Sequence, residues 1–176
     1  MEETRTYKTE VVVPCRVSYV RIDKPYVGVN GTEKYSLTCI IDKEDAATLD
    51  KIRLALDEAF AKGLATKWND SAPDDPCSPL KDGDELRPND EAYKGKYFIS
   101  ASNSKRPEIV DRNVEEIKDR SRVYSGCYCN VVLDMYPFKN STMAGVAAEL
   151  GAIQLVREGE ELSARKSLKS KFSVIE

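Results

Sequence analysis

Apolar and polar residues alternate along several segments of the chain with a period of two, which is typical of β-strands. One such segment covers residues 122–136, where the odd-numbered positions are small or apolar and the even-numbered ones include Tyr124, Tyr128 and Tyr136. We expect the small apolar face to enter a core and the tyrosine-bearing face to form a surface, with Pro137 ending the strand. The same alternation predicts further strands over residues 7–22, 34–41, 96–102 and 151–157.

Helical spacing dominates one segment. Apolar residues recur at intervals of three and four between Leu49 and Phe60, Asp42 precedes them as a candidate N-cap, and Gly63 follows as a candidate C-terminal stop. This pattern predicts one substantial helix that covers an end or a face of a sheet.

Residues 66–93 lack either period. Four prolines and many aspartates predict an acidic, Pro-rich insertion with little regular structure, whose beginning Trp68 is expected to anchor. Residues 81–85 (Lys-Asp-Gly-Asp-Glu) lack the spaced ligands of a calcium loop, so a solvated turn is expected. The insertion is either a solvated loop or an acidic flap that screens a binding groove.

Several strands, one helix and no βαβ alternation predict a mainly β protein. The simplest architecture is an OB-like five-stranded barrel, because that fold commonly places one helix between its third and fourth strands; a sandwich is the alternative. We expect one domain over residues 1–162, including the insertion, and a flexible basic tail over residues 163–176.

Composition removes several kinds of chemistry. The chain has no histidine, which excludes Ser-His-Asp, Cys-His and HExxH sites but not enzymes that use only carboxylates or lysine. We expect no cofactor and no enzymatic activity. The five cysteines lack CxxC spacing, which favours buried free thiols over a disulfide framework or a metal site. No apolar run is long enough to cross a membrane and no signal peptide is visible, so a cytoplasmic location without a membrane partner is expected.

The charges are unevenly distributed although the formal net charge is only −3. Acidic residues concentrate over 70–91, and basic residues concentrate over 94–122, next to the tyrosine-bearing face. Aromatic rings that stack on bases, together with cations that contact phosphates, are what a single-stranded nucleic-acid site needs. The candidate stacking residues are Tyr97, Phe98, Tyr124, Tyr128 and Tyr136, and the candidate phosphate-binding residues are Lys94, Lys96, Lys105, Arg106, Arg112 and Arg122. Alternatively, each tyrosine covers the edge of the core with its hydroxyl in water.

Three passages together resemble phage-encoded single-stranded DNA-binding proteins with an OB fold. They are residues 34–43 (KYSLTCIIDK), residues 80–112 with YKGKYFISASN and RPEIVDR, and residues 123–160 with VYSGCYCNV and GVAAELGAIQLVREGE. The resemblance implies sequence-tolerant binding of single-stranded DNA in phage-type replication or recombination, in the cytoplasm of an infected or prophage-bearing bacterium. It also implies replication or recombination proteins as partners. Many such proteins end in an acidic tail that recruits these partners, whereas residues 165–171 are basic here.

Two other functions remain as alternatives. A carboxylate-dependent metal nuclease would use Glu108 and Asp111, with Asp134 or Asp119 as a further candidate, although no motif holds these acids together. A protein-interaction module would dock a partner, or a second copy of the chain as a homodimer, on the tyrosine-bearing face.

Overall fold

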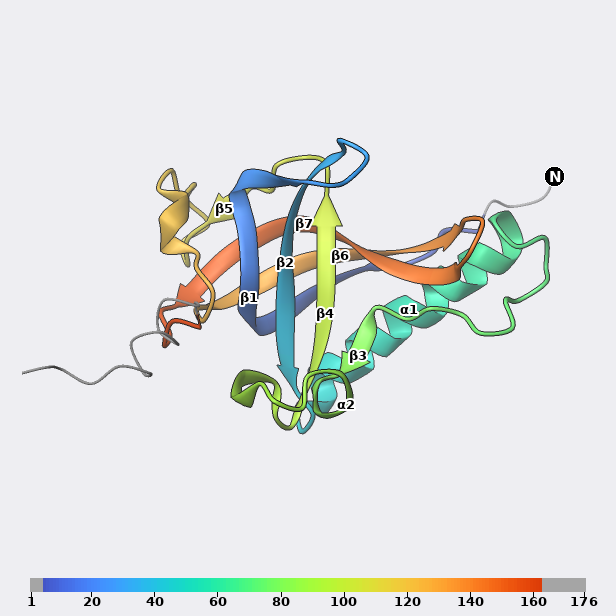
Figure 1. Cartoon of the computed structure of the whole chain (residues 1–176), viewed down its shortest axis with the longest axis horizontal. Helices are drawn as coiled ribbons and strands as arrows, with labels where there is room; N and C mark the ends of the chain where they lie inside the picture. Colours follow the sequence, from blue (N-terminus) through green and yellow to red (C-terminus); the bar gives the residue numbers. More distant parts are fainter. Residues whose placement is uncertain (1–4, 163–176) are drawn as a thin grey trace, which may run out of the picture.

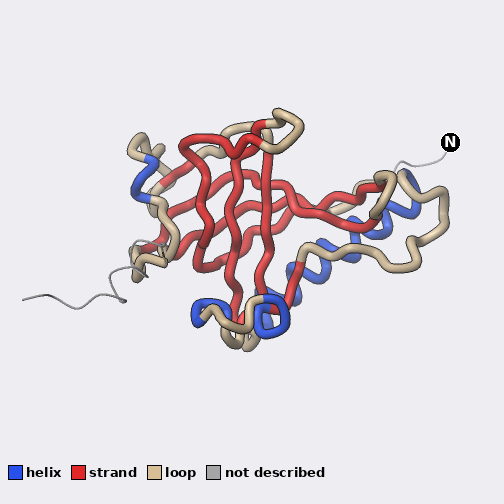
Figure 2. The backbone as a smooth tube through the Cα atoms, in the orientation of Figure 1, coloured by secondary structure: helices blue, strands red, loops and turns tan. Residues whose placement is uncertain are grey.

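The computed structural model describes residues 5–162 (Figure 1). The strands are β1 (Glu10–Val27), β2 (Glu33–Asp42), β3 (Leu80–Asp82), β4 (Lys96–Asn103), β5 (Ile109–Val110), β6 (Tyr128–Lys139) and β7 (Ala144–Arg157). The helices are α1 (Ala46–Thr66), α2 (Gly83–Leu86) and the 3₁₀ turns η1 (Glu91–Tyr93) and η2 (Arg120–Arg122). Figure 2 shows the strands gathered in one sheet structure with the helices at its margins.

Five strands close into a barrel. Antiparallel pairing joins β4 to β2, β2 to β1, β1 to β6 and β6 to β7, and a parallel contact between Ser102 and Glu149 joins β7 back to β4. β1, β2, β4, β6 and β7 are the first to fifth barrel strands along the chain. Around the closed sheet they follow the order 1-2-3-5-4, which is an OB-like arrangement. The predicted mainly β, OB-like five-stranded barrel with one substantial helix is therefore confirmed.

The helix has a different place and different ends from those predicted. α1 connects the second and third barrel strands, β2 and β4, rather than the third and fourth. Its N-cap is Asp45, whose carboxylate accepts from the Thr48 N–H at 3.3 Å, and not Asp42. The helix also continues past Gly63 to Thr66, so Gly63 does not end it. Gly63 instead leaves the space in which the Trp68 ring packs.

The interior faces of the strands agree with the predicted alternation. Val131, Leu133 and Met135 are buried, whereas Tyr128 and Tyr136 lie on the outer face of β6. Four of the five cysteines, Cys15, Cys39, Cys127 and Cys129, are buried free thiols, as predicted, and Cys77 is half-buried.

Pro137 does not end β6, which continues to Lys139. The Met135 N–H bonds to the Thr9 carbonyl on the β1 side, so the nitrogen of Pro137, two residues on, faces the same side beyond the last paired residues of β1. No ladder hydrogen bond is lost there, and a proline is tolerated. β6 also begins at Tyr128, not at residue 122, so Tyr124 lies in the preceding loop.

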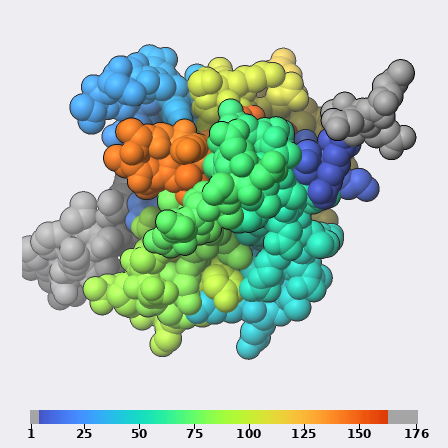
Figure 3. All heavy atoms as spheres, turned by 90° about the vertical axis from the view of Figure 1, so that its right-hand side faces the viewer, coloured from blue at the N-terminus to red at the C-terminus, as the bar shows by residue number. Residues whose placement is uncertain are grey.

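The insertion has more regular structure than its composition predicts, since β3, α2 and η1 all lie in it. Trp68 anchors its beginning as expected: the indole is buried and donates to the Phe138 carbonyl at 3.2 Å. Figure 3 shows the segment after α1 beside the hairpin between β6 and β7. The predicted basic tail, residues 163–176, lies outside the described residues.

Candidate nucleic-acid interface

One outer face of the barrel is lined by hydroxyl groups. β1, β2 and β4 lie side by side in front of the rest of the barrel in Figure 1. On their outward side, Ser18 pairs in register with Thr38, which pairs with Ser100, and Ser36 pairs with Ser102. We call Ser18, Ser36, Thr38, Ser100 and Ser102 the hydroxyl face. The Thr38 and Ser100 hydroxyls are 3.2 Å apart and hydrogen-bonded, and the face offers both donors and acceptors.

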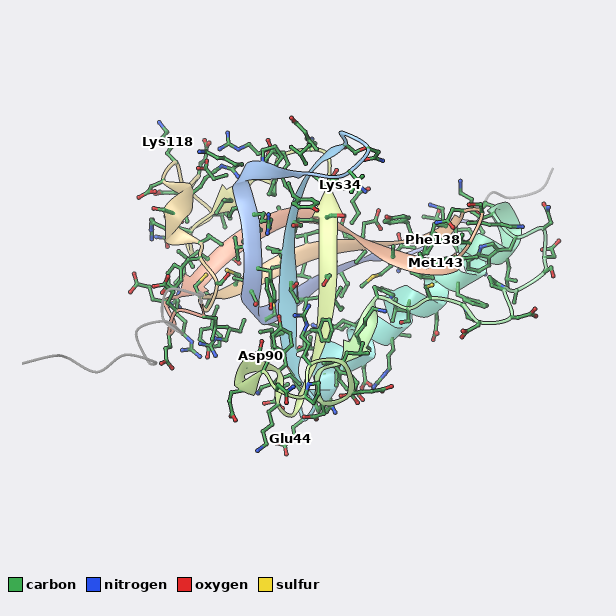
Figure 4. The ribbon with its side chains drawn as sticks, in the orientation of Figure 1. Lys34, Glu44, Asp90, Lys118, Phe138 and Met143 are labelled. Atoms are coloured by element: carbon green, nitrogen blue, oxygen red, sulfur yellow. The ribbon has the colours of Figure 1, made fainter. Side chains whose placement is uncertain are left out.

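Two hollows of about 280 and 810 Å³ lie over this face, and Tyr19 and Arg87 line both of them. The smaller hollow lies over Ser36, Thr38, Ser100 and Ser102. The larger extends from Ser18 to the insertion segment 86–93. Figure 4 shows Lys34 towards one end of β2 and β4, and Glu44 and Asp90 at the opposite end. Because the two hollows share Tyr19 and Arg87, we describe them together as one groove, which extends along the strands from Ser36 and Ser102 to the insertion.

Tyr19 owes its position to an irregularity in β1. Its φ is +49°, and the pairing register of β1 against β2 shifts between Ser18 and Arg21. A non-glycine residue at positive φ breaks the alternation of a strand. The consequence is that the Tyr19 ring is 52% exposed beside the hydroxyl face.

Arg87 is enclosed by aromatic rings. Its guanidinium carbon lies 4.9 Å from the ring centre of Tyr19, 4.8 Å from that of Tyr93 and 4.9 Å from that of Phe98. One terminal nitrogen donates to the Tyr19 hydroxyl at 3.1 Å, and the buried Nε has no hydrogen-bond partner among the described protein atoms. Within residues 5–162 Arg87 forms no ion pair with a carboxylate. Its guanidinium is stabilised by cation–π contacts, and no negative side chain of the described residues neutralises its charge.

The buried neighbours of Arg87 form a small cluster outside the barrel core. Tyr93 and Phe98 meet edge to face at 5.2 Å between ring centres, and Ile40 completes the cluster. Burial raises the pKa of Tyr93, against the opposing effects of the Ser18 hydroxyl and the Arg87 charge. Tyr93 therefore stays protonated and neutral at physiological pH.

Two of the predicted stacking residues lie in β4 and face opposite ways. Tyr97 is half-buried on the inner side of the sheet, with the Lys43 ammonium 5.3 Å from its ring centre. Phe98 is on the outer side but is 4% exposed, beneath Arg87. The Phe98 ring can meet a base only if Arg87 moves, so its stacking role stays a prediction that its burial does not favour.

The other three predicted stacking residues are not a single row on one strand. Tyr124 lies in the loop before β6, where its hydroxyl donates to the Gly159 carbonyl at 2.8 Å. The Tyr128 ring centre lies 3.7 Å from the guanidinium carbon of Arg157 and 5.7 Å from that of Arg16. Tyr136 is exposed near the hairpin, and partial burial together with the Glu149 charge raises its pKa.

The six predicted phosphate-binding residues are dispersed around the barrel. Lys96 is paired with Asp42 at 3.0 Å, and Arg106 with Asp23 at 3.1 Å. Arg112 and Arg122 line a hollow of about 280 Å³ beside the end of β7. Lys94 and Lys105 are exposed, in the turn before β4 and the loop after it.

The arrangement across the strands brings Tyr128 next to cations that the sequence did not single out. Arg16 pairs in register with both Ile40 and Tyr128, and Tyr128 pairs with Arg157. A hollow of about 480 Å³ over these residues also contacts Asn130 and Lys96. We call Arg16, Tyr128, Asn130 and Arg157 the Tyr128 surface.

The sequence did not single out five residues that line these hollows: Arg16, Tyr19, Arg21, Arg87 and Arg157. The alternation of hydroxyl residues over 34–41 and 98–102 was a usable signal for the hydroxyl face. No local signal indicated Tyr19 or Arg87, because one depends on a bulge and the other lies in an irregular segment.

Three of the four acids of the nuclease alternative accept hydrogen bonds from nearby groups. Asp134 accepts from the Thr9 hydroxyl at 2.6 Å, Asp119 accepts from the Ser121 N–H at 3.1 Å, and Asp111 accepts from the backbone of its own loop. Glu108 is exposed. In the described part of the chain, no three His, Cys, Asp or Glu residues are grouped to hold a metal ion.

None of the helices that the structure describes is both long and apolar enough to span a membrane.

Comparison with known proteins gives consistent results. The sequence model of a family described as the single-stranded DNA-binding protein of Enterobacter phage Enc34 matches residues 8–176. Putative protein p50 of Acyrthosiphon pisum secondary endosymbiont phage 1 is 28% identical over 152 residues, which cover 82% of this chain and 81% of that protein.

Solved structures agree with this match. The single-stranded DNA-binding protein from bacteriophage Enc34, in complex with single-stranded DNA, superposes with a TM-score of 0.73 at 26% identity and covers 88% of each chain. Gp2.5, a single-stranded DNA-binding protein encoded by bacteriophage T7, superposes with a TM-score of 0.61 at 17% identity, over 89% of this chain and 96% of that one. At that identity the T7 likeness concerns the fold.

Proposed function

The chain belongs to the family of the Enterobacter phage Enc34 single-stranded DNA-binding protein, and on this premise we propose that it binds single-stranded DNA across the hydroxyl face. Binding is tolerant of sequence and involves no catalysis. The protein acts in phage replication or recombination, in the cytoplasm of the bacterial host. Replication or recombination proteins are its further partners.

The chemistry of the hydroxyl face is the observation that carries this proposal. OB folds bind oligonucleotides on the face of their second and third strands, which here are β2 and β4. That face combines hydroxyl groups with an exposed tyrosine, Tyr19, and two arginines, Arg21 and Arg87, that form no ion pair within residues 5–162. Phosphates need cations, bases need ring faces, and base edges need hydrogen-bonding groups.

DNA bases stack first on the Tyr19 ring and then on the Tyr128 ring. The Tyr19 ring is 52% exposed at the groove, whereas one side of Tyr128 is covered by Arg157. A base can stack on the guanidinium plane of Arg157 as well as on a ring. Tyr136, Tyr97, Phe98 and Tyr124 remain candidate contacts of a longer strand.

Phosphate contacts come first from Arg21 and Arg87 and then from the Tyr128 surface, whose Arg16 is anchored by bonds to the Gly126 and Glu160 carbonyls. Four further cations lie at the ends of the barrel, on either side of the proposed DNA path: Lys94, Lys105, Arg112 and Arg122. Lys96 and Arg106 would have to exchange their carboxylate partners, Asp42 and Asp23, for phosphate.

A salt titration tests the proposal. Fluorescence anisotropy of labelled oligo-dT is measured against the full chain from about 50 to about 200 mM salt, next to a duplex of equal length. Each phosphate neutralised on a single strand contributes about 0.7 to the magnitude of the slope of log K against log salt. With Arg21 and Arg87 both engaged, the slope should be at least about 1.4 in magnitude, and the single strand should be preferred.

Absence of oligo-dT binding at about 50 mM salt overturns the proposal. The same incubation with magnesium should leave the oligonucleotide intact, and its cleavage would instead support the nuclease alternative.

A further inference from the structure

Acidic residues of the insertion fasten it to the barrel. The Lys43 ammonium at the end of β2 is 2.7 Å from an Asp82 carboxylate oxygen and 2.8 Å from one of Asp84. The other oxygen of Asp84 accepts from the Gly95 N–H at 3.0 Å, immediately before β4. Asp82 also caps α2, since it accepts from the Asp84 N–H at 2.9 Å. These carboxylates face a lysine and backbone donors, and not the groove.

Gly83 lets the segment lie flush against the barrel. A Cβ atom at this position would lie 2.5 Å from the Tyr93 carbonyl oxygen and 2.8 Å from that of Lys96. Both contacts are with backbone atoms, which cannot move aside as a side-chain end can. α2 is therefore held close to the backbone at the start of β4.

The position of α2 determines where the Arg87 side chain lies. It is the C-cap of α2, its N–H bonds to the Gly83 carbonyl at 2.9 Å, and its side chain extends from there over Phe98 to Tyr19. The nearby Asp90 carboxylate accepts from the Ala92 N–H at 3.1 Å and forms no ion pair with Arg87.

Rings hold a guanidinium without neutralising it. Each cation–π contact stabilises the cation by roughly 0.5–2 kcal/mol, and the planar group keeps its remaining N–H donors in a fork that matches a phosphate. A carboxylate partner would compete with the DNA backbone, whereas a ring face does not. The desolvated Nε–H, which has no acceptor among the described protein atoms, adds to the cost of leaving this group without an anion.

We propose that the acidic insertion is a positioning device: Asp82 and Asp84, through Lys43 and Gly95, set α2 so that Arg87 binds a DNA phosphate at the hydroxyl face. This inference rests on the proposed single-stranded DNA binding. It opposes the alternative in which the acids of the insertion screen the groove against DNA. The two alternatives predict opposite changes in DNA affinity. Removal of a screening carboxylate raises the affinity, and removal of a positioning carboxylate lowers it.

The test uses the full chain with Arg87→Ala, Asp84→Ala and the double variant, in salt titrations with oligo-dT. Arg87→Ala should bind about tenfold more weakly at low salt, with a slope smaller in magnitude by about 0.7, the contribution of one phosphate. Asp84→Ala should also weaken binding and reduce the slope, although it removes a negative charge. In the Arg87→Ala background, Asp84→Ala should have no further effect.

Two matched controls accompany these variants. Asp74→Ala removes an exposed acid of the insertion that has no contact with Lys43, and Arg53→Ala removes an exposed arginine of α1. Neither should reduce affinity or slope as Arg87→Ala does. Asp84→Asn, which keeps an acceptor for the Gly95 N–H, replaces Asp84→Ala if thermal unfolding shows that the latter is not folded.

An unchanged slope in Arg87→Ala, with salt-dependent binding by the unsubstituted chain, overturns this inference and leaves the proposed function intact. Higher affinity in Asp84→Ala establishes screening instead. Equal losses from Asp84→Ala with and without Arg87 exclude positioning through Arg87. Failure of the unsubstituted chain to bind oligo-dT removes the proposed function itself.

Discussion

Gly63 and Trp68 show how a single position sets the junction between α1 and the barrel. A Cβ atom on Gly63 would lie 2.4–2.7 Å from three carbons of the Trp68 ring. The ring also contacts Phe60 at 5.0 Å between centres, and its N–H bonds to the Phe138 carbonyl of β6. The glycine thus allows the indole to connect the helix with the hairpin.

Gly63→Ala should destabilise the protein by about 1–3 kcal/mol, because the ring cannot be accommodated without displacement. Helix propensity alone predicts the opposite sign, a gain of about 1 kcal/mol. Urea unfolding monitored by circular dichroism measures the difference. The control is Ala65→Gly at an exposed position of the same helix, which should lose about 1 kcal/mol. A more stable Gly63→Ala would show that the indole does not occupy this space.

Tyr19 offers a second prediction for a single residue. Tyr19→Ala should weaken oligo-dT binding by about 1–3 kcal/mol, the usual contribution of one stacked base. Tyr19→Phe keeps the ring and loses the bond from Arg87, so it should retain most of the affinity. Anisotropy titrations measure both, with Tyr7→Ala, outside the groove, as the control. Equal losses in the two Tyr19 variants would assign its role to the hydroxyl and not to stacking.

Among the elements, α2 is too short to be stable by itself and depends on its polar contacts. Lys43 lowers the pKa of Asp82 and of Asp84, and the two carboxylates in turn raise the pKa of Lys43. A carboxyl group whose pKa is lower in the folded state stabilises that state above its unfolded pKa, near 3.9, and loses this contribution as pH falls further. For Lys43 the contribution is present below its unfolded pKa, near 10.4, and is lost above it.

Lys43→Met should therefore lower the free energy of unfolding by a small amount at neutral pH. The difference from the unsubstituted chain should shrink as pH falls below about 4, because the carboxylates become protonated. Urea unfolding at a series of pH values measures this convergence. Lys51→Met, on an exposed position of α1, is the control and should show a difference that does not vary in this way. A constant difference for Lys43→Met would contradict the role of the ion pairs.

At the scale of the whole molecule, barrel closure brings four cysteines from three strands or their ends into one interior. Cys15 of β1 pairs in register with Cys129 of β6, and Cys39 of β2 pairs with Val17 of β1. The Cys127 and Cys129 sulfurs are 3.7 Å apart. Each thiol fills core volume, and access to it requires opening of the barrel.

A thiol reagent should therefore modify no more than one cysteine per chain in the native protein, and all five after denaturation. The expected reactive residue is Cys77, which is half-buried in the segment that pairs with β7. Absorbance of the released chromophore counts the modified thiols. Cys77→Ser should abolish the native reaction, and rapid modification of a second thiol would show that the barrel opens readily.

The two-residue period predicted the inner faces of the strands because burial of one face depends on local alternation alone. It did not predict the strand ends, since Pro137 is tolerated only where β1 no longer pairs with β6. Likewise, Asp45 rather than Asp42 caps α1, a choice that depends on where β2 leaves the sheet. The sequence singled out five aromatic residues as stacking candidates, but the exposure of each ring depends on which other residues cover it.

The sequence by itself therefore determined the strand faces, the single long helix, the buried cysteines and the resemblance to phage single-stranded DNA-binding proteins. All of these depend on residue type and on spacing between near neighbours. Only the tertiary structure decided which face carries the groove, because it joins Ser18, Thr38 and Ser100 from three strands. It also placed Arg87 of the insertion against Tyr19 of β1, 68 residues away, a contact that exists only once the barrel has closed.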